Sequence, residues 1–306
     1  SFRIDHRIPY PEKNNKLLID PLPAGTYTIG TGGYFLNIDS AFNKLTIDGI
    51  AGDVVLELID SLYTAPTSQY GFFLNGPISG TGPNSRILMK PVANKKVIIE
   101  GSNEAIFNFN NTSYLTIDGV GDTGATTLTI HALKNLNYAF NDAIDFLNNS
   151  DHNAIQNITF IVDDYLKPSS AIYFSGSAPD SNLIQYNFVK KAGMFISIIS
   201  GGKGNIIRGN QIGSETDSLV AYGIEVANCE GTLIENNLIQ NMKVTLSGSN
   251  QAMIGIALDS GNNQIIRNNV VKNIRAISGY ITSGIYVGVG GTNNQVYNNM
   301  VYDINS

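Results

Sequence analysis

The sequence predicts an all-β chain wound as a right-handed parallel β-helix, a solenoid whose turns stack on one another. First, an asparagine recurs with an aliphatic residue three positions before it and another two positions after it. Second, an aliphatic anchor precedes each such asparagine by 13 to 15 residues, while the distance on to the next anchor varies from 9 to 19. A rigid half-repeat joined by one connection of variable length is typical of a solenoid. The asparagines are Asn187, Asn210, Asn237, Asn269 and Asn299, and the anchors are Ile172, Ile196, Ile224, Ile256 and Ile285.

The third observation is the kind of strand between these markers. Segments such as "YGIEV" and "IGIAL" are short, rich in β-branched and aromatic residues, and bounded by Gly, Asn and Ser. Crossovers between parallel strands are right-handed, which sets the hand of the coil. The asparagines are expected to adopt the left-handed conformation at a tight corner and to bond to one another along the axis as a ladder.

The N-terminal part predicts an irregular arm over residues 1–24, followed by the β-helix over residues 25–306. A short amphipathic helix is expected before the first strand, which is placed at residues 53–59. The helix would cover the open, apolar end of the coil, because solenoids need such a cap. Its apolar positions are Ile38, Phe42 and Leu45, its candidate N-caps are Asp39 and Ser40, and Gly49 should end it.

Further strands are expected before the regular repeat begins. Residues 143–160 keep the spacing, with Ile144 as anchor and Ile158 in the place that later turns give to asparagine, so the ladder should start after this turn. The earlier strands are expected at residues 96–101, 105–109, 114–119 and 127–130.

These residues resemble a known superfamily. Residues 25–63, followed by turns of the type "GI...N.I..N.V", are similar to the pectate-lyase-like right-handed β-helices, with the closest likeness to large secreted surface proteins of the type IX secretion kind. The resemblance spans roughly residues 24–304. It implies the fold and an extracellular or cell-surface location. It leaves the activity open, since members include pectate lyases, polygalacturonases, phage tailspikes and adhesins.

The enzyme motifs of that superfamily are incomplete here. Polygalacturonase-like members carry an Asn-Thr-Asp motif, an Asp pair and a Gly-His-Gly, and "NDAID" at residues 141–145 echoes only the first. None of His6, His131 and His152 lies in a Gly-His-Gly. This departure argues against the hydrolase.

Lyases of the superfamily hold calcium on acidic side chains, and calcium requires six to eight oxygen ligands. Glu215, Asp217 and Glu225 are candidate calcium oxygens, but no EF-hand or nonapeptide calcium motif is present. No metal or other cofactor is therefore assigned, and calcium is kept as a lesser alternative.

Composition limits the partners of the chain. A net charge of -6 provides no basic footprint for nucleic acid. The sequence has 37 Asn and 31 Gly, and no apolar run approaches the ~18 residues of a membrane span. Cys229, the single cysteine, excludes an intrachain disulfide. Because the last repeat ends without a cap, a fragment of a longer chain is expected, with further domains or a partner at the C-terminal end.

Functional residues are expected on the outer face of the anchor strands, because side chains alternate along a strand. The residues after the anchors form a column of Asp145, Tyr173, Ser197, Glu225, Ala257 and Tyr286. Asp145, Tyr173 and Tyr286 are the candidate substrate-binding residues for an extended sugar chain. Segments 213–221, 241–253 and 273–283 leave from one corner and would form a wall beside them.

One pair of acids is a candidate for catalysis. Glu225 and Asp259 lie one turn and two residues apart, which predicts a backbone separation of ~8 Å. That value falls within the ~6.5–9.5 Å expected for the carboxyls of an inverting glycosidase. The alternative is that two exposed acids come this close by chance. Arg208, Glu235 and Arg267 are expected instead to stack as a charge ladder of structural value.

Three functional hypotheses follow. The leading one is a secreted or cell-surface module with a structural or adhesive role that binds polysaccharide on its exposed sheet face. The alternative is a polysaccharide lyase or inverting glycoside hydrolase acting on an extended, acidic glycan through Glu225 and Asp259. The third is a leucine-rich horseshoe, but the repeats lack a Leu-x-x-Leu-x-Leu frame and convex-side helices.

Overall fold

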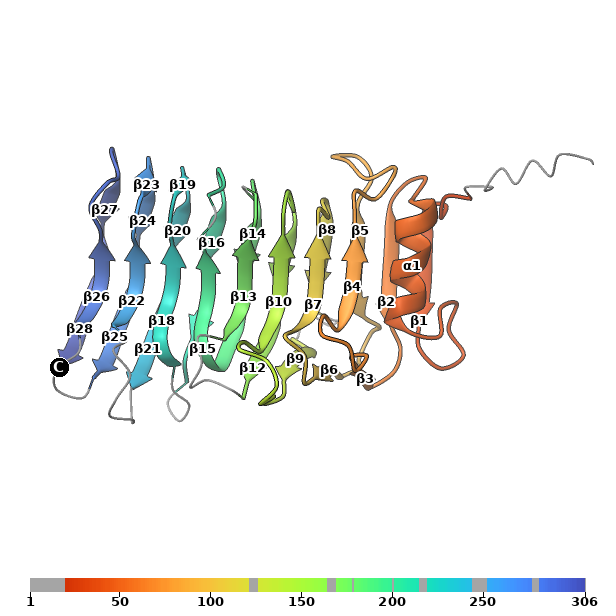
Figure 1. Cartoon of the computed structure of the whole chain (residues 1–306), viewed down its shortest axis with the longest axis horizontal. Coiled ribbons are helices and arrows are strands. Elements are labelled where there is room, and N and C mark those ends of the chain that lie inside the picture. The colour runs from red at the N-terminus through yellow and green to blue at the C-terminus, as the bar shows by residue number, and fades with distance from the viewer. Residues whose placement is uncertain are drawn as a thin grey trace, which may run out of the picture.

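The computed structural model describes residues 20–120, 126–163, 169–177, 179–199, 201–214, 219–243, 252–276 and 281–305. The chain forms a right-handed parallel β-helix with helix α1 (Ile38–Asp48) across its N-terminal end (Figure 1). Each turn of the coil, here called a rung, stacks on the next. Residues 1–19 lie outside the described part, so the N-terminal arm stays a prediction.

Each regular rung contributes one strand to each of three faces. The first face is a separate 10-stranded sheet. It contains β1 (Gly25–Ile29), β2 (Val54–Leu58), β5 (Ile87–Pro91), β8 (Leu115–Asp118), β11 (Ala154–Gln156), β14 (Leu183–Gln185), β16 (Ile206–Arg208), β20 (Leu233–Glu235), β24 (Ile265–Arg267) and β27 (Gln295–Tyr297).

The second and third faces join into one 16-stranded sheet, because the long strand β15 (Phe188–Ile198) belongs to both. The second face also contains β3 (Leu62–Thr64), β6 (Val97–Gly101), β9 (Leu128–Ala132), β12 (Ile158–Val162), β17 (Gln211–Ile212), β21 (Leu238–Lys243), β25 (Val270–Arg275) and β28 (Met300–Asn305). The third face also contains β4 (Phe72–Asn75), β7 (Ala105–Asn110), β10 (Asp142–Leu147), β13 (Ser170–Ser175), β18 (Leu219–Val226), β22 (Met253–Leu258) and β26 (Thr282–Val287). A short pair, β19 (Cys229–Glu230) and β23 (Gly261–Asn262), lies at a corner.

The N-terminal helix is confirmed, but two details of its prediction are wrong. Asn37 is the N-cap rather than Asp39 or Ser40, because the Asn37 side chain accepts from the Ser40 backbone N–H while the Ser40 hydroxyl accepts from the N-cap N–H. Strand β1 comes before the helix, so residues 53–59 hold the second strand rather than the first. Gly49 ends the helix as expected, at a φ of 74°.

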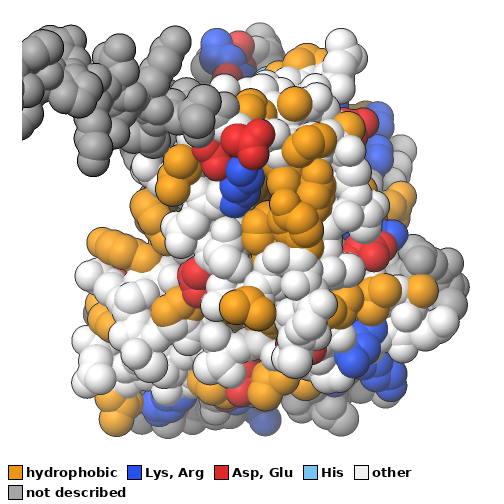
Figure 2. Space-filling model, turned by 90° about the vertical axis from the view of Figure 1, so that its right-hand side faces the viewer, with side chains coloured by type: hydrophobic (Ala, Val, Ile, Leu, Met, Phe, Trp, Pro, Cys, Tyr) orange, Lys and Arg blue, Asp and Glu red, His pale blue; other side chains and the backbone are white. Residues whose placement is uncertain are grey.

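The helix covers an aromatic stack inside the coil. Phe42 of α1 lies 6.2 Å from both Phe107 and Phe109, measured between ring centroids. The stack continues from Phe109 to Phe146 at 5.2 Å and from Phe146 to Phe174 at 4.7 Å. The outer surface of this end mixes hydrophobic and neutral polar side chains with few charges (Figure 2). The helix therefore closes the apolar interior, as the sequence predicts.

The predicted asparagine ladder is present at the corner between the first and second faces. The Oδ1 atom of Asn237 accepts from both the backbone N–H and the Nδ2 of Asn210, at 3.0 and 2.9 Å. The Nδ2 of Asn237 also donates to the carbonyl of Ile207, at 3.0 Å. The same bonding links the other members of the set, Asn187, Asn210, Asn269 and Asn299.

The backbone conformation of the ladder residues differs from the prediction. The residue before each ladder asparagine takes the left-handed conformation, and the ladder asparagine itself does not. Tyr186, for example, has a φ of 55°. The two tasks are divided, since the left-handed residue turns the chain and the next side chain points inward to bond. Equivalent left-handed residues are Asn157, Gly209, Asn236, Asn268 and Asn298.

A second, shorter ladder was not predicted. It lies at the corner between the third and first faces, where Asn182 Oδ1 accepts from Asn153 N and Asn205 Oδ1 accepts from Asn182 N, both at 2.9 Å. Thr232 occupies the following rung, so the repeat of asparagine is broken there. This interruption hides the pattern in the sequence.

The predicted charge ladder lies on the first face. Arg208, Glu235 and Arg267 occupy adjacent register positions, and Arg267 binds Glu235 at 2.7 Å. Arg208 donates from Nε to Gln185 at 2.9 Å.

Cys229 is buried, and burial raises the pKa of its thiol to about 12. Its burial favours a structural role for Cys229, and the ion pair favours a structural role for the charge ladder.

In the last described rung, Val296 and Val301 are 45% and 43% exposed, whereas the equivalent Ile266 and Val271 in the preceding rung are fully buried.

Within the described part of the chain, no helix has both the length and the hydrophobicity needed to cross a lipid bilayer.

We expect Asn237→Ala to lower the free energy of unfolding by about 2–4 kcal/mol, because it leaves buried donors of Asn210 and the Ile207 carbonyl without partners. Chemical denaturation monitored by circular dichroism measures the change. Asn43→Ala, on the exposed side of the cap helix, is the control and should change stability little. Equal effects of the two substitutions would contradict a stabilising ladder.

Candidate functional site

The register of the predicted column is confirmed on the third face, although Asp145, Ser197 and Ala257 are buried there. Asp145 pairs in register with Tyr173, Tyr173 with Ser197, and Ser197 with Glu225. Ala257 and Tyr286 continue the row in β22 and β26. The anchors before these residues are buried, and Ile285 in the last of these strands is partly buried, as alternation along a strand requires.

A second outward column, not predicted from the sequence, runs beside the first. Alternation breaks in each strand because the residue before the anchor also points inward; a Cβ on Gly255 would meet side chains of Val271 and Ile274. The residue two positions before the anchor consequently lies on the outer surface of the coil. The second column consists of Asp142, Ser170, Met194, Tyr222, Ile254 and Ser283.

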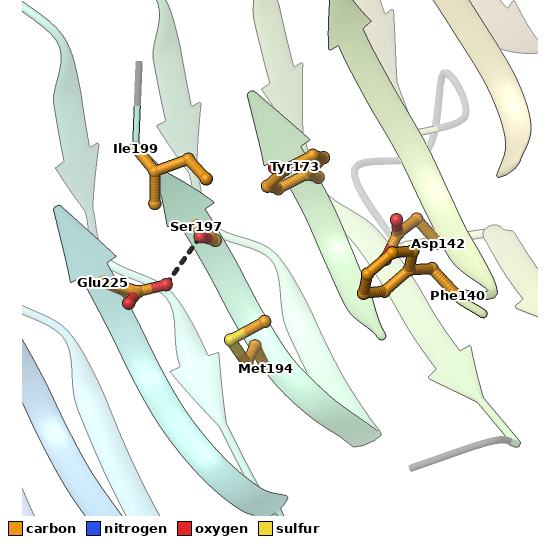
Figure 3. Close-up of a pocket in the computed structure, with 7 residues that line it drawn as sticks. All are labelled: Phe140, Asp142, Tyr173, Met194, Ser197, Ile199 and Glu225. Atoms are coloured by element: carbon orange, nitrogen blue, oxygen red, sulfur yellow. Dashed lines mark hydrogen bonds between the residues drawn. The ribbon is translucent and has the colours of Figure 1, made fainter. Parts of the chain in front are cut away.

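The two columns border a groove of about 260 Å³. Figure 3 shows its side chains projecting from β10, β13, β15 and β18 and from the segment before β10. Apolar groups predominate, with carboxyl groups from Asp142 and Glu225. The lining residues are Phe140, Asp142, Tyr173, Met194, Ser197, Ile199 and Glu225.

The groove is centred on the rung formed by β15. This strand runs unbroken from the second face onto the third, whereas neighbouring rungs have a connection there, such as residues 163–169 and 213–218. Met194 and Ser197 lie on this rung. The sequence contained the signal, because the distance from Asn187 to the anchor Ile196 is the shortest of its kind.

A buried carboxyl pair lies at one end of the groove. Asp142 and Asp145 are 5% and 8% exposed and hydrogen bond to each other. Burial raises the pKa of Asp142 to about 7, against its hydrogen bond from Ser170 N. The pKa of Asp145 is also well above its usual range, through burial and then the charges of Asp142 and Glu104. Two carboxyls in this position share protons rather than both ionising.

Three buried polar atoms beside this pair, two acceptor oxygens and one hydroxyl, have no hydrogen-bond partner among the described residues. They are Asp145 Oδ1, Asn108 Oδ1 and Ser170 Oγ. Asn108 precedes Asp145 in the first column, and Ser170 follows Asp142 in the second. This end of the groove therefore has more acceptors than donors.

The other end of the groove is formed by Glu225. Its Oε2 accepts from the Ser197 hydroxyl at 2.7 Å. Burial raises the pKa of Glu225, the Ser197 bond opposes this, and the charge of Asp259 raises it further. Tyr222, half-buried beside them, also has a raised pKa, through burial and then the charges of Glu225 and Asp259.

The predicted site residues separate in the structure. Tyr173 and Glu225 line the groove, Asp145 is almost covered beside Asp142, and Tyr286 lies two strands beyond Glu225. Asp259 is exposed and near enough to Glu225 to affect its pKa. The catalytic roles of this pair stay a prediction.

The calcium hypothesis also stays a prediction, because Glu215 and Asp217 lie outside the described residues. Among the residues that are described, no group of three or more His, Cys, Asp or Glu is arranged to hold a metal ion. Parts of the expected loop wall, residues 215–218, 244–251 and 277–280, are likewise not described.

Comparison with known proteins shows the fold alone. No protein-family model matches the sequence, and no curated protein matches it either. Among solved structures, an alginate lyase from Paenibacillus sp. strain FPU-7 is similar with a TM-score of 0.54 and 13% identity, covering 92% of this chain and 98% of that one. Pectate lyase Pel9A is similar with a TM-score of 0.56 and 13% identity, covering 92% of this chain and 70% of that one. The chain thus has the pectate-lyase-like right-handed β-helix fold.

The buried pair predicts that stability falls with rising pH. Because the folded-state pKa of Asp142 is about 7 against an ordinary value of 3.8, the folded protein holds a proton that the unfolded chain releases between these values. The free energy of unfolding should therefore decrease as the pH rises from about 4 through 7.

We expect Asp142→Asn to reduce this dependence and to raise the unfolding midpoint at pH 8 by roughly a few degrees. Thermal unfolding at pH 5 and pH 8 measures it. Glu230→Gln, which changes an exposed carboxylate, is the matched control. An unchanged difference between the two pH values in Asp142→Asn would show that the pair ionises freely.

Proposed function

We propose that this protein is a secreted or cell-surface β-helix module that binds polysaccharide in the groove of its third face, in a structural or adhesive role. The observation that carries the proposal is a concave, largely apolar site with a few fixed polar groups, which is the usual form of a ligand site. Phe140 and Tyr173 provide ring surface, and Asp142 and Glu225 provide acceptors for hydroxyl groups.

The geometry of the rungs supports a polymeric ligand. Neighbouring strands lie ~4.8 Å apart, so a row of side chains across several rungs offers repeated contacts to an extended chain. Asp145, Tyr173, Ser197 and Glu225 form such a row. Because β15 runs unbroken from the second face to the third, no connection between strands lies beside the middle of this row, whereas neighbouring rungs have one.

The proposed location outside the cell is supported by composition. Only 14% of residues are charged, and 37 asparagines supply much of the neutral polar surface. A coil stabilised by side-chain ladders needs no disulfide, which fits the lone, buried Cys229. We also propose that the protein is similar to large surface proteins of the type IX secretion kind, and this likeness rests on the repeat pattern of the sequence.

One observation favours a second candidate, an inverting polysaccharide hydrolase. Glu225 has the raised pKa that a general acid needs, and Asp259 lies nearby as a potential base for water. Elimination by a lyase has less support, because no Lys or Arg that could act as the base is among the described residues that line the groove.

The binding proposal predicts that Tyr173→Ala and Phe140→Ala each weaken polysaccharide affinity by about 10-fold or more, through loss of apolar contact area. Affinity electrophoresis or calorimetry with the ligand found in a glycan panel measures this. Tyr186→Asn is the matched control, because Tyr186 is an exposed tyrosine at another corner, where most other rungs have asparagine.

The same samples distinguish binding from hydrolysis. Under the leading proposal, the wild-type protein binds without releasing reducing ends. Turnover that is lost in Glu225→Gln while binding persists would replace the proposal with the hydrolase. Affinity that is unaffected by either groove substitution would place the binding site elsewhere or remove it.

A further inference from the structure

The groove contains acids and other hydrogen-bond acceptors. No Lys or Arg is among the described residues that line it. Asp142, Asp145, Glu225 and Asp259 all belong to the two outward columns or border them, and Glu104 lies beside Asp142. The pKa values of these buried acids and of the half-buried Tyr173 and Tyr222 are raised by burial and by neighbouring acids, and in the described part of the chain no Lys or Arg lowers them. The site therefore has a negative potential when its carboxyls ionise.

Two of the described cations of the coil pair with acids of the protein. Lys191 lies on the second-face part of β15 and binds Asp163 at 3.4 Å, and Asp163 also contacts His131 at 3.0 Å. Arg267 binds Glu235 on the first face. No described cation that would pair with a carboxylate on a ligand lines the groove.

We propose, building on the proposed function, that the groove selects an uncharged polysaccharide and rejects polyuronates. A uronate carboxylate in the groove would face the desolvated Glu225 and the Asp142–Asp145 pair, and like charges brought together in a partly buried site repel strongly. A carboxylate also cannot donate a hydrogen bond to the surplus acceptors. Hydroxyl groups of a neutral sugar can donate to Glu225 and Asp142, and their hydrogen bonds to an ionised carboxylate are of the stronger kind.

This inference separates the chain from its structural neighbours. The two similar structures are named as an alginate lyase and a pectate lyase, whereas the groove of this protein has the opposite electrostatic preference to one suited to an acidic chain. For the enzymatic alternative, it replaces the acidic glycan expected from the sequence with a proposed neutral one. A hydrolase remains compatible with a neutral substrate.

Binding is measured at pH 8 in low salt with EDTA, using neutral glucan, xylan, galactan and mannan oligosaccharides against polygalacturonate and alginate oligosaccharides. Polygalacturonate and its methyl ester form a pair with the same sugar backbone, in which each carboxylate is replaced by an uncharged ester. We expect the tightest ligand to be uncharged and to bind on the order of 100-fold more tightly than any polyuronate. The methyl ester should also bind more tightly than polygalacturonate.

The variants Glu225→Gln and Asp142→Asn should reduce the discrimination against polygalacturonate by about 10-fold, because each removes one negative charge. Glu230→Gln, at a corner outside the groove, should leave it unchanged. Unchanged discrimination in the groove variants would overturn the electrostatic explanation.

The outcomes distinguish this inference from the proposed function. Tight binding of polygalacturonate or alginate in EDTA, or after addition of calcium, would overturn the selection of uncharged chains while leaving a polysaccharide-binding groove in place. Preferred binding of quaternised chitosan oligosaccharides, which keep their positive charge at pH 8, would overturn it in the same way. Absence of binding to every glycan in the panel would overturn the proposed function itself.

Discussion

The constraint on which this structure depends is that identical backbone positions must stack in register along the axis. Parallel strands supply regularly spaced hydrogen bonds, and the asparagine column locks the corner to them, since each Oδ1 accepts two bonds from the adjacent rung. Because the corner is fixed, the strands of each face stay in register, and residues that are 23 to 32 positions apart in the sequence become neighbours. The outer columns of the third face are a direct result.

The sequence was sufficient for the fold because the repeat is visible at single residues. Asn210 and Asn237 identify the corner, and Ile224 and Ile256 identify the buried side of the third face, from which the column with Tyr173 and Glu225 follows. The second column could not be found in this way. Its residues become outward only because the residue before each anchor, which is small in most rungs and is Phe195 in the rung of β15, turns inward and breaks the period of two that the prediction used.

The same break explains why the acid pair was missed. Asp142 and Asp145 are three residues apart, so simple alternation places them on opposite sides of a strand, whereas their carboxyls hydrogen bond to each other. The conformation of Tyr186 shows a similar limit, since an asparagine-rich corner does not reveal which of two adjacent residues is left-handed. Periodicity predicts stacking well, and local departures from it determine the chemistry of the surface.

The unbroken strand β15 has a consequence for how such a protein can change. In a coil of stacked rungs, the interior is sealed by the strands, while the height of the surface beside the groove depends on the length of each corner connection. Lengthening the chain between Lys191 and Met194 by a few residues would raise a barrier across the groove, and Ala192 is the core side chain within that segment. Recognition could thus be acquired or abolished by insertion and deletion at one corner, independently of the architecture that supports it.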